Sequence, residues 1–591
     1  MISSLQFLLP LAAFGAVAVP AHAAQTAIEA RGELARRIEL VRDRMLHGDV
    51  PRFSDDFILA DIALRPDYPR RFAEYSGDVS GRVIGAYAMM PSPQTDAHLK
   101  ELARAALQFQ KGDGRFGSAA LEFTPEKVGQ DHMALLWGNG RLLVGLLEYN
   151  SAQPEPDALK ASQRLGDFLL KVYDGCANPQ VAERVKDFGA GGMICFTQLI
   201  EGLVMLSQAT HDHKYIDGAE RILPWIQKDR GKQHTHGYLS TLRGVVMLYE
   251  ATKDAKHLAM VEELYAGLVN SPDYTIYGGV MEYFGGKGDR SEGCSEADFL
   301  RLSLQLWRVT GKTDYLENAE RNLLNEFYGN QFATGDFGHH WITSAGISPC
   351  LGSGRAWWCC TMHGLRAFRD VLDSVVTAKD GLVRINLFED AVWSDKANSL
   401  AIAWNTASGS SPQLSVTVEK AAAEGARLTV RKPAWASVVS VNAAGANATA
   451  KEEGGYLFID RALHAGERVD VSFTCQPRLV KRDGVPLVFD QLAKEPVQAA
   501  LFYGPWLLGV DEVDNSPYFN EPIAGNRVTL PREFVSDGAA GLRAVPCAHV
   551  KCSYVHDGFP GTQSLTLRPV SERSAHEPAS FAVWLNYTAD K

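Results

Sequence analysis

The segment Leu199–Tyr215, LIEGLVMLSQATHDHKY, recurs twice further along the chain. Its copies are LRGVVMLYEATKDAKH at Leu242–His257 and LRLSLQLWRVTGKTDY at Leu300–Tyr315. Each copy has apolar residues at helical spacing, a threonine-centred turn and the start of another helix. Helical hairpins of this kind cannot bury their apolar faces alone, so we expect them to stack on one another.

Helical patterning extends from about Ala27 to Val376, and Gly140–Tyr149 begins a weaker copy of the repeat. The loops between the helical pairs are unequal and rich in glycine, histidine and aromatic residues, as in residues 187–193 and 233–238. Such loops are typical of a pocket at one mouth of a rigid frame. We therefore predict that the hairpins close into an (α/α) barrel over residues 24–378, with an open solenoid as the alternative.

After Ala378 the pattern changes from helical spacing to short segments with the composition of strands, such as Leu382–Phe388 and Val469–Phe473. Several short strands separated by turns predict a β-sandwich over residues 379–482. A further set, from Val497–Tyr503 onward, predicts a second sandwich or an extension over residues 483–591. The predicted fold class is therefore multidomain α plus β, with a barrel followed by sandwich domains.

The first 23 residues have the pattern of a signal peptide, with an apolar run at Leu5–Val19 and a small-x-small site at Ala21-His22-Ala23. We expect export to a periplasm or to the outside of the cell. No later segment is apolar over the length that a membrane span needs, so no membrane insertion is expected after the signal is removed.

The composition is that of a large globular protein, since 46% of its 591 residues are hydrophobic and 22% are charged. The net charge of −11 argues against nucleic acid as a partner. Nine cysteines leave at least one unpaired within the chain, and Cys547 and Cys552 are close enough to form a disulfide. The oligomeric state stays open.

Two short groups of residues carry the chemistry: Trp357-Trp358-Cys359-Cys360 and Glu292-Gly293-Cys294. Thiolates and carboxylates are zinc ligands, so the two groups supply four donors for one tetrahedral ion. A zinc ion with four protein ligands is normally structural, because a catalytic zinc keeps one position open. Buried thiols, or disulfides to distant cysteines, are the alternative interpretation.

A second carboxylate, Glu282, follows the Gly278-Gly279 turn and stands ten residues before Glu292. A thiolate facing a carboxylic acid provides the two groups of a retaining glycosidase, with sulfur in place of the usual nucleophilic oxygen. A surface carboxylate without a catalytic role is the alternative for Glu282.

These motifs give the chain a resemblance to the β-L-arabinofuranosidase family, glycoside hydrolase family 127, over most of its length. The matching segments are Gly279–Glu282, Glu292-x-Cys294, Trp358–Cys360, Leu428–Trp435 and Glu495–Pro505. The resemblance implies an (α/α)6 barrel with β-sandwich domains behind it. It also implies a zinc ion held by one glutamate and three cysteines.

Carried over by position, the resemblance implies that Glu292, Cys294, Cys359 and Cys360 bind zinc. Cys359 would attack the anomeric carbon, and Glu282 would be the acid/base, with Glu296 as its competitor. Candidate substrate-binding residues are Asp78, His132, Trp137, Gln198, His234, His236 and Trp358. Gln198 stands where relatives often have a histidine, so the identity of the sugar stays open.

The leading hypothesis is a secreted, retaining glycoside hydrolase that acts on a glycan and releases arabinofuranose or a related sugar. The first alternative is a polysaccharide lyase or unsaturated-uronide hydrolase, with Tyr238 and His236 as the catalytic pair. The second is a carbohydrate-binding scaffold in which the same zinc ion is purely structural.

Overall fold

The computed structural model describes residues 26–47, 53–65, 75–285, 290–350, 357–406, 411–487, 492, 496–520, 522–531, 549–557, 560–573 and 579–589. The signal peptide predicted over residues 1–23 lies outside these ranges. So does Cys547, and with it the predicted disulfide to Cys552. Within the described residues, no helix combines the length and apolar character needed to cross a bilayer.

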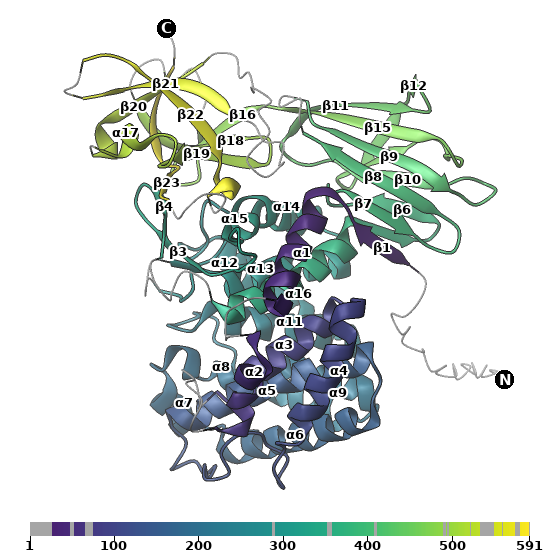
Figure 1. The fold of residues 1–591 in the computed structure, drawn as a ribbon, viewed down its shortest axis with the longest axis vertical. Helices are drawn as coiled ribbons and strands as arrows, with labels where there is room; N and C mark the ends of the chain where they lie inside the picture. Colours follow the sequence, from purple (N-terminus) through teal and green to yellow (C-terminus); the bar gives the residue numbers. More distant parts are fainter. Residues whose placement is uncertain are drawn as a thin grey trace, which may run out of the picture.

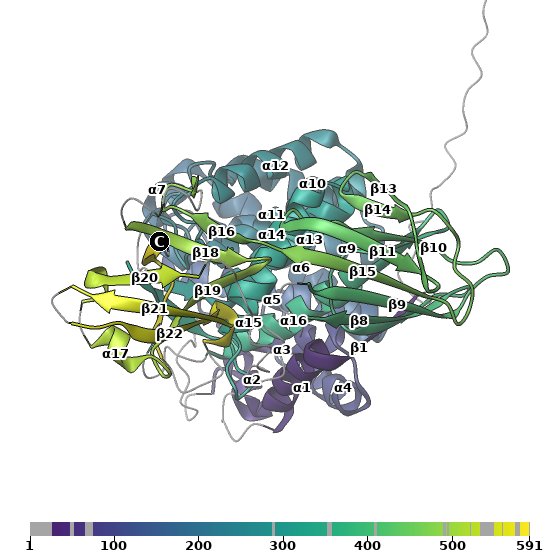
Figure 2. The same cartoon turned by 90° about the horizontal axis from the view of Figure 1, so that it is seen from above.

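Six helices form a closed inner ring, each packed against the next, and the last packs back on the first. In ring order they are α3 (Asp78–Met89), α5 (Gln130–Ala152), α9 (Leu199–Thr210), α11 (Thr235–Thr252), α13 (Gly293–Thr310) and α16 (Trp358–Val375). Each packs against one helix of an outer layer, respectively α4 (Pro93–Leu107), α6 (Pro156–Cys176), α10 (Lys214–Ile222), α12 (Ala255–Val269), α14 (Thr313–Asn322) and α1 (Gly32–His47). The closed ring confirms the predicted barrel and excludes the open solenoid. The helices gather in one body with the sheets against one side of it (Figures 1 and 2).

The three copies of the repeat end in the same way. Helices α9, α11 and α13 each finish on a threonine whose hydroxyl donates to the carbonyl four residues earlier, at 2.7–2.8 Å. The next residue has positive φ in each case: 59° at His211, 59° at Lys253 and 73° at Gly311. Its backbone N–H donates to the carbonyl of the last helical turn, which is the usual left-handed C-cap.

Two sheets form the β-sandwich that follows the barrel. The larger contains, in spatial order, β1 (Ala27–Ala30), β7 (Ala391–Ser394), β8 (Ser399–Asn405), β9 (Gln413–Lys420), β15 (Arg468–Cys475), β11 (Ala436–Ala443) and β12 (Ala446–Asn447). The smaller contains β13 (Ala450–Glu453), β14 (Tyr456–Ile459), β10 (Arg427–Arg431), β6 (Leu382–Ile385) and β5 (Val376–Lys379).

The start of the chain differs from the predicted helical domain. Residues Ala27–Ala30 form β1, which pairs antiparallel with β7 at the edge of the sandwich, and the helix begins only at Gly32 (Figure 1). Four residues are enough for a strand when a neighbouring edge offers unpaired backbone groups, a long-range effect that helical periodicity does not reveal.

A third sheet spans the C-terminal region and part of the barrel domain. Its order is β17 (Pro486–Leu487), β16 (Pro477–Val480), β18 (Val497–Tyr503), β24 (Leu585–Ala589), β20 (Asn526–Leu530), β21 (Val550–His556), β22 (Gln563–Pro569), β19 (Trp506–Asp511), β23 (Phe581–Ala582), β4 (Gly346–Pro349), β3 (His339–Ile342) and β2 (Arg290–Glu292). Strand β16 lies before residue 482 and already belongs to this third sheet. The C-terminal β region therefore begins earlier than the boundary predicted at residue 482. The sheet reaches Glu292, so the C-terminal region braces one of the predicted metal ligands.

Candidate active site

Four buried side chains with sulfur and oxygen donors meet at the N-termini of two neighbouring inner helices. Glu292 ends β2 and is the N-cap of α13, Cys294 lies in the first turn of α13, and Cys359 and Cys360 lie in the first turn of α16. One donor atom from each lies within 4.8 Å of the others, and the Sγ atoms of Cys294 and Cys360 are 3.8 Å apart. The predicted set is thus brought together.

The donor set fits a metal ion. Three sulfurs and one carboxylate oxygen suit a soft or borderline cation such as zinc, and the positive ends of both helix dipoles favour thiolates. Burial raises the pKa of Cys294 and of Cys360 well above the usual range, as does the neighbouring Cys359 thiolate. For Cys359 burial acts in the same direction, but hydrogen bonds from the other two thiols and the charge of Arg82 lower its pKa well below the usual range.

Glu282 lies beside this cluster and is 5% exposed. Its carboxylate is within 4.8 Å of donor atoms of Glu292 and His234, and 4.0 Å from Nε2 of His339. Arg290 forms a bidentate ion pair with it, with one contact at 2.7 Å from Nη2 to Oε1. Backbone hydrogen bonds hold the residue on both sides, from its N–H to the Arg290 carbonyl and from the N–H of Thr235 to its own carbonyl.

The competitor Glu296 occupies a different place. Its carboxylate is fully buried and accepts hydrogen bonds from the backbone N–H of Val280 and from the side chain of Asn322. Burial and the neighbouring Glu326 raise the pKa of Glu296 well above the usual range. Glu296 therefore supports the turn at Gly279 and Val280 through these contacts, whereas Glu282 lies beside Glu292.

Two predicted histidines join the cluster from the start of α11. Nε2 of His234 lies 3.2 Å from Oε2 of Glu292. Burial alone would lower the pKa of His234, but the charge and hydrogen bond of Glu292 outweigh it and raise that pKa. His236 donates from Nδ1 to Asp298, and its Nε2 lies 3.0 Å from the guanidinium of Arg82.

Asp78 links Arg82 to Trp137, whose ring also packs edge-on against that of His236, with centroids 5.4 Å apart. Oδ1 of Asp78 accepts from Nε of Arg82 at 2.7 Å and from the indole N–H of Trp137 at 2.9 Å. The other end of Arg82 lies 3.9 Å from Sγ of Cys294. Asp78 and Trp137 therefore orient the cation that faces the thiols.

The other predicted substrate-binding residues, His132, Gln198 and Trp358, contact other parts of the barrel domain. His132 sits in the first turn of α5, where its Nε2 lies 3.1 Å from the carbonyl of Glu122. Gln198 is fully buried, and its amide oxygen accepts two hydrogen bonds from Arg141. Trp358 is 5% exposed, with its ring 6.5 Å from that of Phe57. Among the described residues, no recorded contact links His132 or Gln198 to the thiol cluster.

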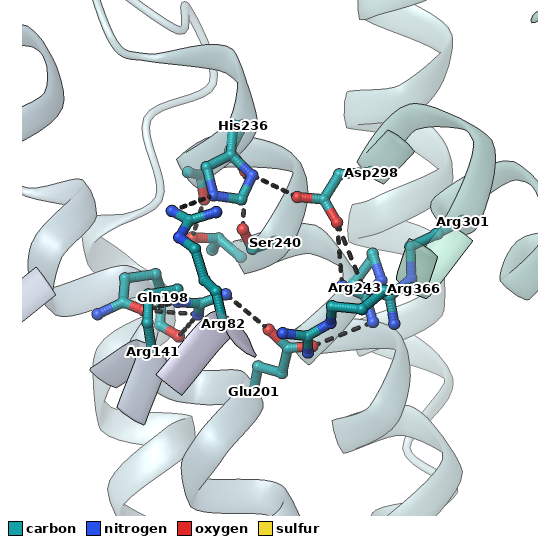
Figure 3. Close-up of polar contacts among 12 residues, drawn as sticks. Arg82, Arg141, Gln198, Glu201, His236, Ser240, Arg243, Asp298, Arg301 and Arg366 are labelled. Carbon is teal, nitrogen blue, oxygen red and sulfur yellow. Dashed lines mark hydrogen bonds and ion pairs between the residues drawn. The ribbon is translucent and has the colours of Figure 1, made fainter. Parts of the chain in front are cut away.

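The inner helices also carry a buried ionic network that the sequence patterns above did not predict (Figure 3). Glu201 pairs with Arg141 at 3.1 Å and with Arg243 at 3.0 Å, and Arg243 also pairs with Asp298 at 3.1 Å. Further members are Arg301 and Arg366, paired with Asp370 and Glu148 respectively. Buried charges of this kind persist only when each has a partner.

The sequence did contain a signal for this network. Glu201, Arg243 and Arg301 each stand nine residues before the threonine that ends their helix, so they are equivalent positions of the repeat. Side chains at one equivalent position of a helical repeat point in the same direction relative to the barrel axis, so these three charged residues are expected on one side of the ring. Arg82, Arg290 and His339 carried no comparable signal.

The lyase alternative receives no support from the geometry. Tyr238 is 1% exposed and packs edge-on against Phe284, with ring centroids 5.2 Å apart. Burial raises the pKa of Tyr238 well above its usual range, whereas a lyase needs a tyrosine that ionises readily.

The (α/α)6 barrel thus holds a buried glutamate-and-cysteine cluster with a second carboxylate beside it, the combination expected of a glycoside hydrolase that uses a thiolate. Comparison with models of known protein families identifies the family. Residues 73–372 match the model of the β-L-arabinofuranosidase GH127 catalytic domain, and residues 382–475 match that of the GH127 middle domain. The chain belongs to the GH127 β-L-arabinofuranosidase family.

Solved structures agree with this assignment at the level of the fold. One is Ara127N, a GH127 β-L-arabinofuranosidase from Geobacillus stearothermophilus T6, with 16% identity and a TM-score of 0.70 over 95% of this chain and 100% of that one. Another is BT3674, a GH127 β-arabinofuranosidase, with 15% identity and a TM-score of 0.73 over 95% and 98% of the two chains. No curated protein sequence matches the chain.

Proposed function

We propose that this hydrolase is an exported, retaining β-L-arabinofuranosidase that uses a zinc-bound cysteine as nucleophile. The observation that carries the proposal is the approach of Glu282 to a buried cluster of one glutamate and three cysteines. Membership of the family supports a glycan substrate, and the named activity of Ara127N supports arabinofuranose as the sugar. Export is supported by the pattern of residues 1–23 alone.

Glu292, Cys294, Cys359 and Cys360 would hold the ion. Bound zinc would keep the thiols deprotonated, which makes sulfur a nucleophile at neutral pH. Cys359 is the ligand assigned to attack, as the resemblance to the family implies, and its donor atom lies within 4.8 Å of the other three. Cys294 and Cys360, which donate hydrogen bonds to sulfur in the free protein, complete the donor set.

The reaction has two displacements at one carbon. In the first, Sγ of Cys359 attacks the anomeric carbon, the bond to the glycosidic oxygen breaks, and Glu282 gives its proton to the leaving oxygen. In the second, ionised Glu282 takes a proton from water, whose oxygen attacks the same carbon and displaces the sulfur. Two inversions leave the configuration of the sugar unchanged.

Arg290 has to release Glu282 for this chemistry to begin. Two guanidinium contacts of Arg290 occupy the Glu282 carboxylate, whereas the first displacement needs that group to face the glycosidic oxygen as proton donor. A substrate that attracts the guanidinium would free the carboxyl group at the moment of binding.

The test is a screen of 4-nitrophenyl furanosides and pyranosides, with metal content measured on the same preparation. We expect release of nitrophenol from the β-L-arabinofuranoside, about one zinc per chain, and the β-anomer of arabinose as the first product seen by NMR. Full activity in metal-free protein, or the α-anomer as first product, would contradict the mechanism. A zinc-loaded protein that cleaves none of the glycosides would favour the scaffold alternative.

A further inference from the structure

The face of the β2–β3 pair that carries Glu292 continues outward from the thiol cluster. Glu292 lies opposite His339, and two residues earlier on β2 Arg290 lies opposite Trp341. Directly opposed residues of an antiparallel pair project from the same face, as do residues two apart on one strand. All four side chains therefore share one face, with the outer pair about 7 Å beyond the inner pair.

The exposed fraction of the side chains rises from the inner pair, Glu292 and His339, to the outer pair, Arg290 and Trp341. Glu292 and His339 are each 5% exposed, whereas Trp341 is 42% exposed. The side chain of Arg290 lies between these values at 28%. Within the described ranges Trp341 is the only tryptophan or phenylalanine that is strongly exposed. The face thus leads from the buried donors to solvent and ends on an indole ring.

Contacts between side chains give the order along this face. Glu282 is close to Glu292 at its inner side and is held by Arg290 at its outer side. The guanidinium of Arg290 lies 5.8 Å from the centre of the Trp341 ring. If Glu282 protonates the glycosidic oxygen, the cleaved sugar lies on its inner side, so the leaving group lies toward Arg290 and Trp341.

We propose that Arg290 and Trp341 form the subsite for the sugar residue on the leaving-group side of the cleaved bond. The indole ring stacks on the apolar face of that sugar, and the guanidinium donates hydrogen bonds to its hydroxyl oxygens. Because Arg290 then bonds to the sugar, it gives up its ion pair with Glu282. The subsite rests on the proposed function, since Glu282 marks the position of the bond.

A simpler role for Trp341 is to cover the aliphatic part of the Arg290 side chain. The experiment must distinguish this role from sugar binding. The chain offers a matched pair for comparison: Arg482 lies 4.5 Å from the centre of the Trp584 ring. Trp584 and Ile342, the neighbour of Trp341 on β3, both pack against one hydrophobic cluster. Because Ile342 and Trp341 project from opposite faces of β3, that cluster lies on the face away from Trp341. Trp584→Ala is the control.

The experiment compares two probes on zinc-loaded enzyme. A β-linked disaccharide of L-arabinofuranose occupies both sides of the bond, whereas free L-arabinose, used as a competitive inhibitor, occupies only the inner side. We expect Trp341→Ala to lower kcat/KM for the disaccharide about tenfold, mainly through KM. The inhibition constant of L-arabinose should stay within about twofold of wild type. Trp341→Phe should keep most of the activity, and Trp584→Ala should change neither value.

Equal effects of Trp341→Ala on both probes, or no effect on either, would overturn the subsite. Should the alanine variant fail to fold, Arg290→Gln supplies a second measurement. Its loss in disaccharide binding should exceed its loss in L-arabinose binding, and equal losses would again overturn the proposal. A wild-type enzyme that releases no arabinose from the disaccharide would overturn the proposed function and the subsite together.

Discussion

The guanidinium of Arg82 lies 3.9 Å from Sγ of Cys294 through Nη1, while its Nε donates to Asp78 at 2.7 Å. One buried arginine thus joins a carboxylate on its own helix to the thiol cluster on another. Arg82 presents a positive charge to the thiols, and its position depends on the Asp78 carboxylate.

Loss of the Arg82 charge should destabilise the barrel. Arg82→Met removes the ion pair of the Asp78 carboxylate, which is 7% exposed, and keeps its hydrogen bond from the indole of Trp137. Removing one member of a buried pair costs about 3 kcal/mol, so the free energy of unfolding should fall by that amount in urea titrations. Arg65→Met, in a pair whose side chains are 40% and 71% exposed, is the control and should cost less than about 1 kcal/mol. Equal losses in the free energy of unfolding for Arg82→Met and Arg65→Met would contradict a larger contribution from the buried pair.

Removal of a ligand that is not the nucleophile should remove the metal. Cys360 is fully buried within the donor set, and a serine hydroxyl is a poor zinc ligand. Cys360→Ser should lower the affinity for zinc by more than about tenfold and lower turnover in parallel. Cys195, a fully buried thiol that lies 3.4 Å from the carbonyl of Ala190, provides the control. Cys195→Ser should keep its zinc in competition with a chelating dye. If Cys195→Ser loses zinc affinity as much as Cys360→Ser does, the specific site is refuted.

Cys359 and Glu282 should show separable roles in kinetics. Cys359→Ser should abolish turnover of every glycoside, because a serine hydroxyl is not ionised at neutral pH. Glu282→Gln should slow the first displacement most for leaving groups that need a proton, while a nitrophenyl glycoside retains more of its rate. Added azide should speed the second displacement in this variant. If Glu282→Gln affects all substrates equally, the acid/base lies elsewhere and Glu296→Gln is the next variant to measure.

A buried carboxyl group at the junction of barrel and sandwich should make stability depend on pH. Glu389 accepts a hydrogen bond from the hydroxyl of Tyr328 at 2.7 Å, and burial raises the pKa of Glu389 to about 8. An unfolded glutamate has a pKa of about 4.3, so between these values the folded state binds a proton that the unfolded chain has released. This group therefore lowers stability as the pH rises through that window.

Glu389→Gln should remove this dependence. Relative to wild type, its melting temperature should rise by about 2–4 °C near pH 8 and stay unchanged near pH 4. Glu452, whose side chain is 53% exposed, serves as the control, and Glu452→Gln should follow the wild-type profile. A parallel shift of the Glu389→Gln curve at both pH values would mean that the proton is not involved.

Much of the fold was predictable because its signals are local. The repeated helix–threonine–helix segments specify hairpins, and each copy ends in the same left-handed cap at His211, Lys253 or Gly311. The four donors were also predictable, since Glu292-x-Cys294 and Cys359-Cys360 are each short in sequence and each opens a helix. Neighbouring helices of a closed ring bring their first turns together, so two local motifs became one site.

Helical periodicity, strand patterning and two short motifs were enough to predict the barrel of hairpins, the sandwich that follows it and the residues of the donor cluster. The surroundings of that cluster could not be predicted, because they come from distant parts of the chain. Arg82 and Cys294 are separated by 212 positions, and Trp341 faces Arg290 only through the pairing of β2 with β3. Periodicity and motif spacing report on neighbours along the chain. The charge, exposure and direction of these side chains depend on which distant elements pack beside them.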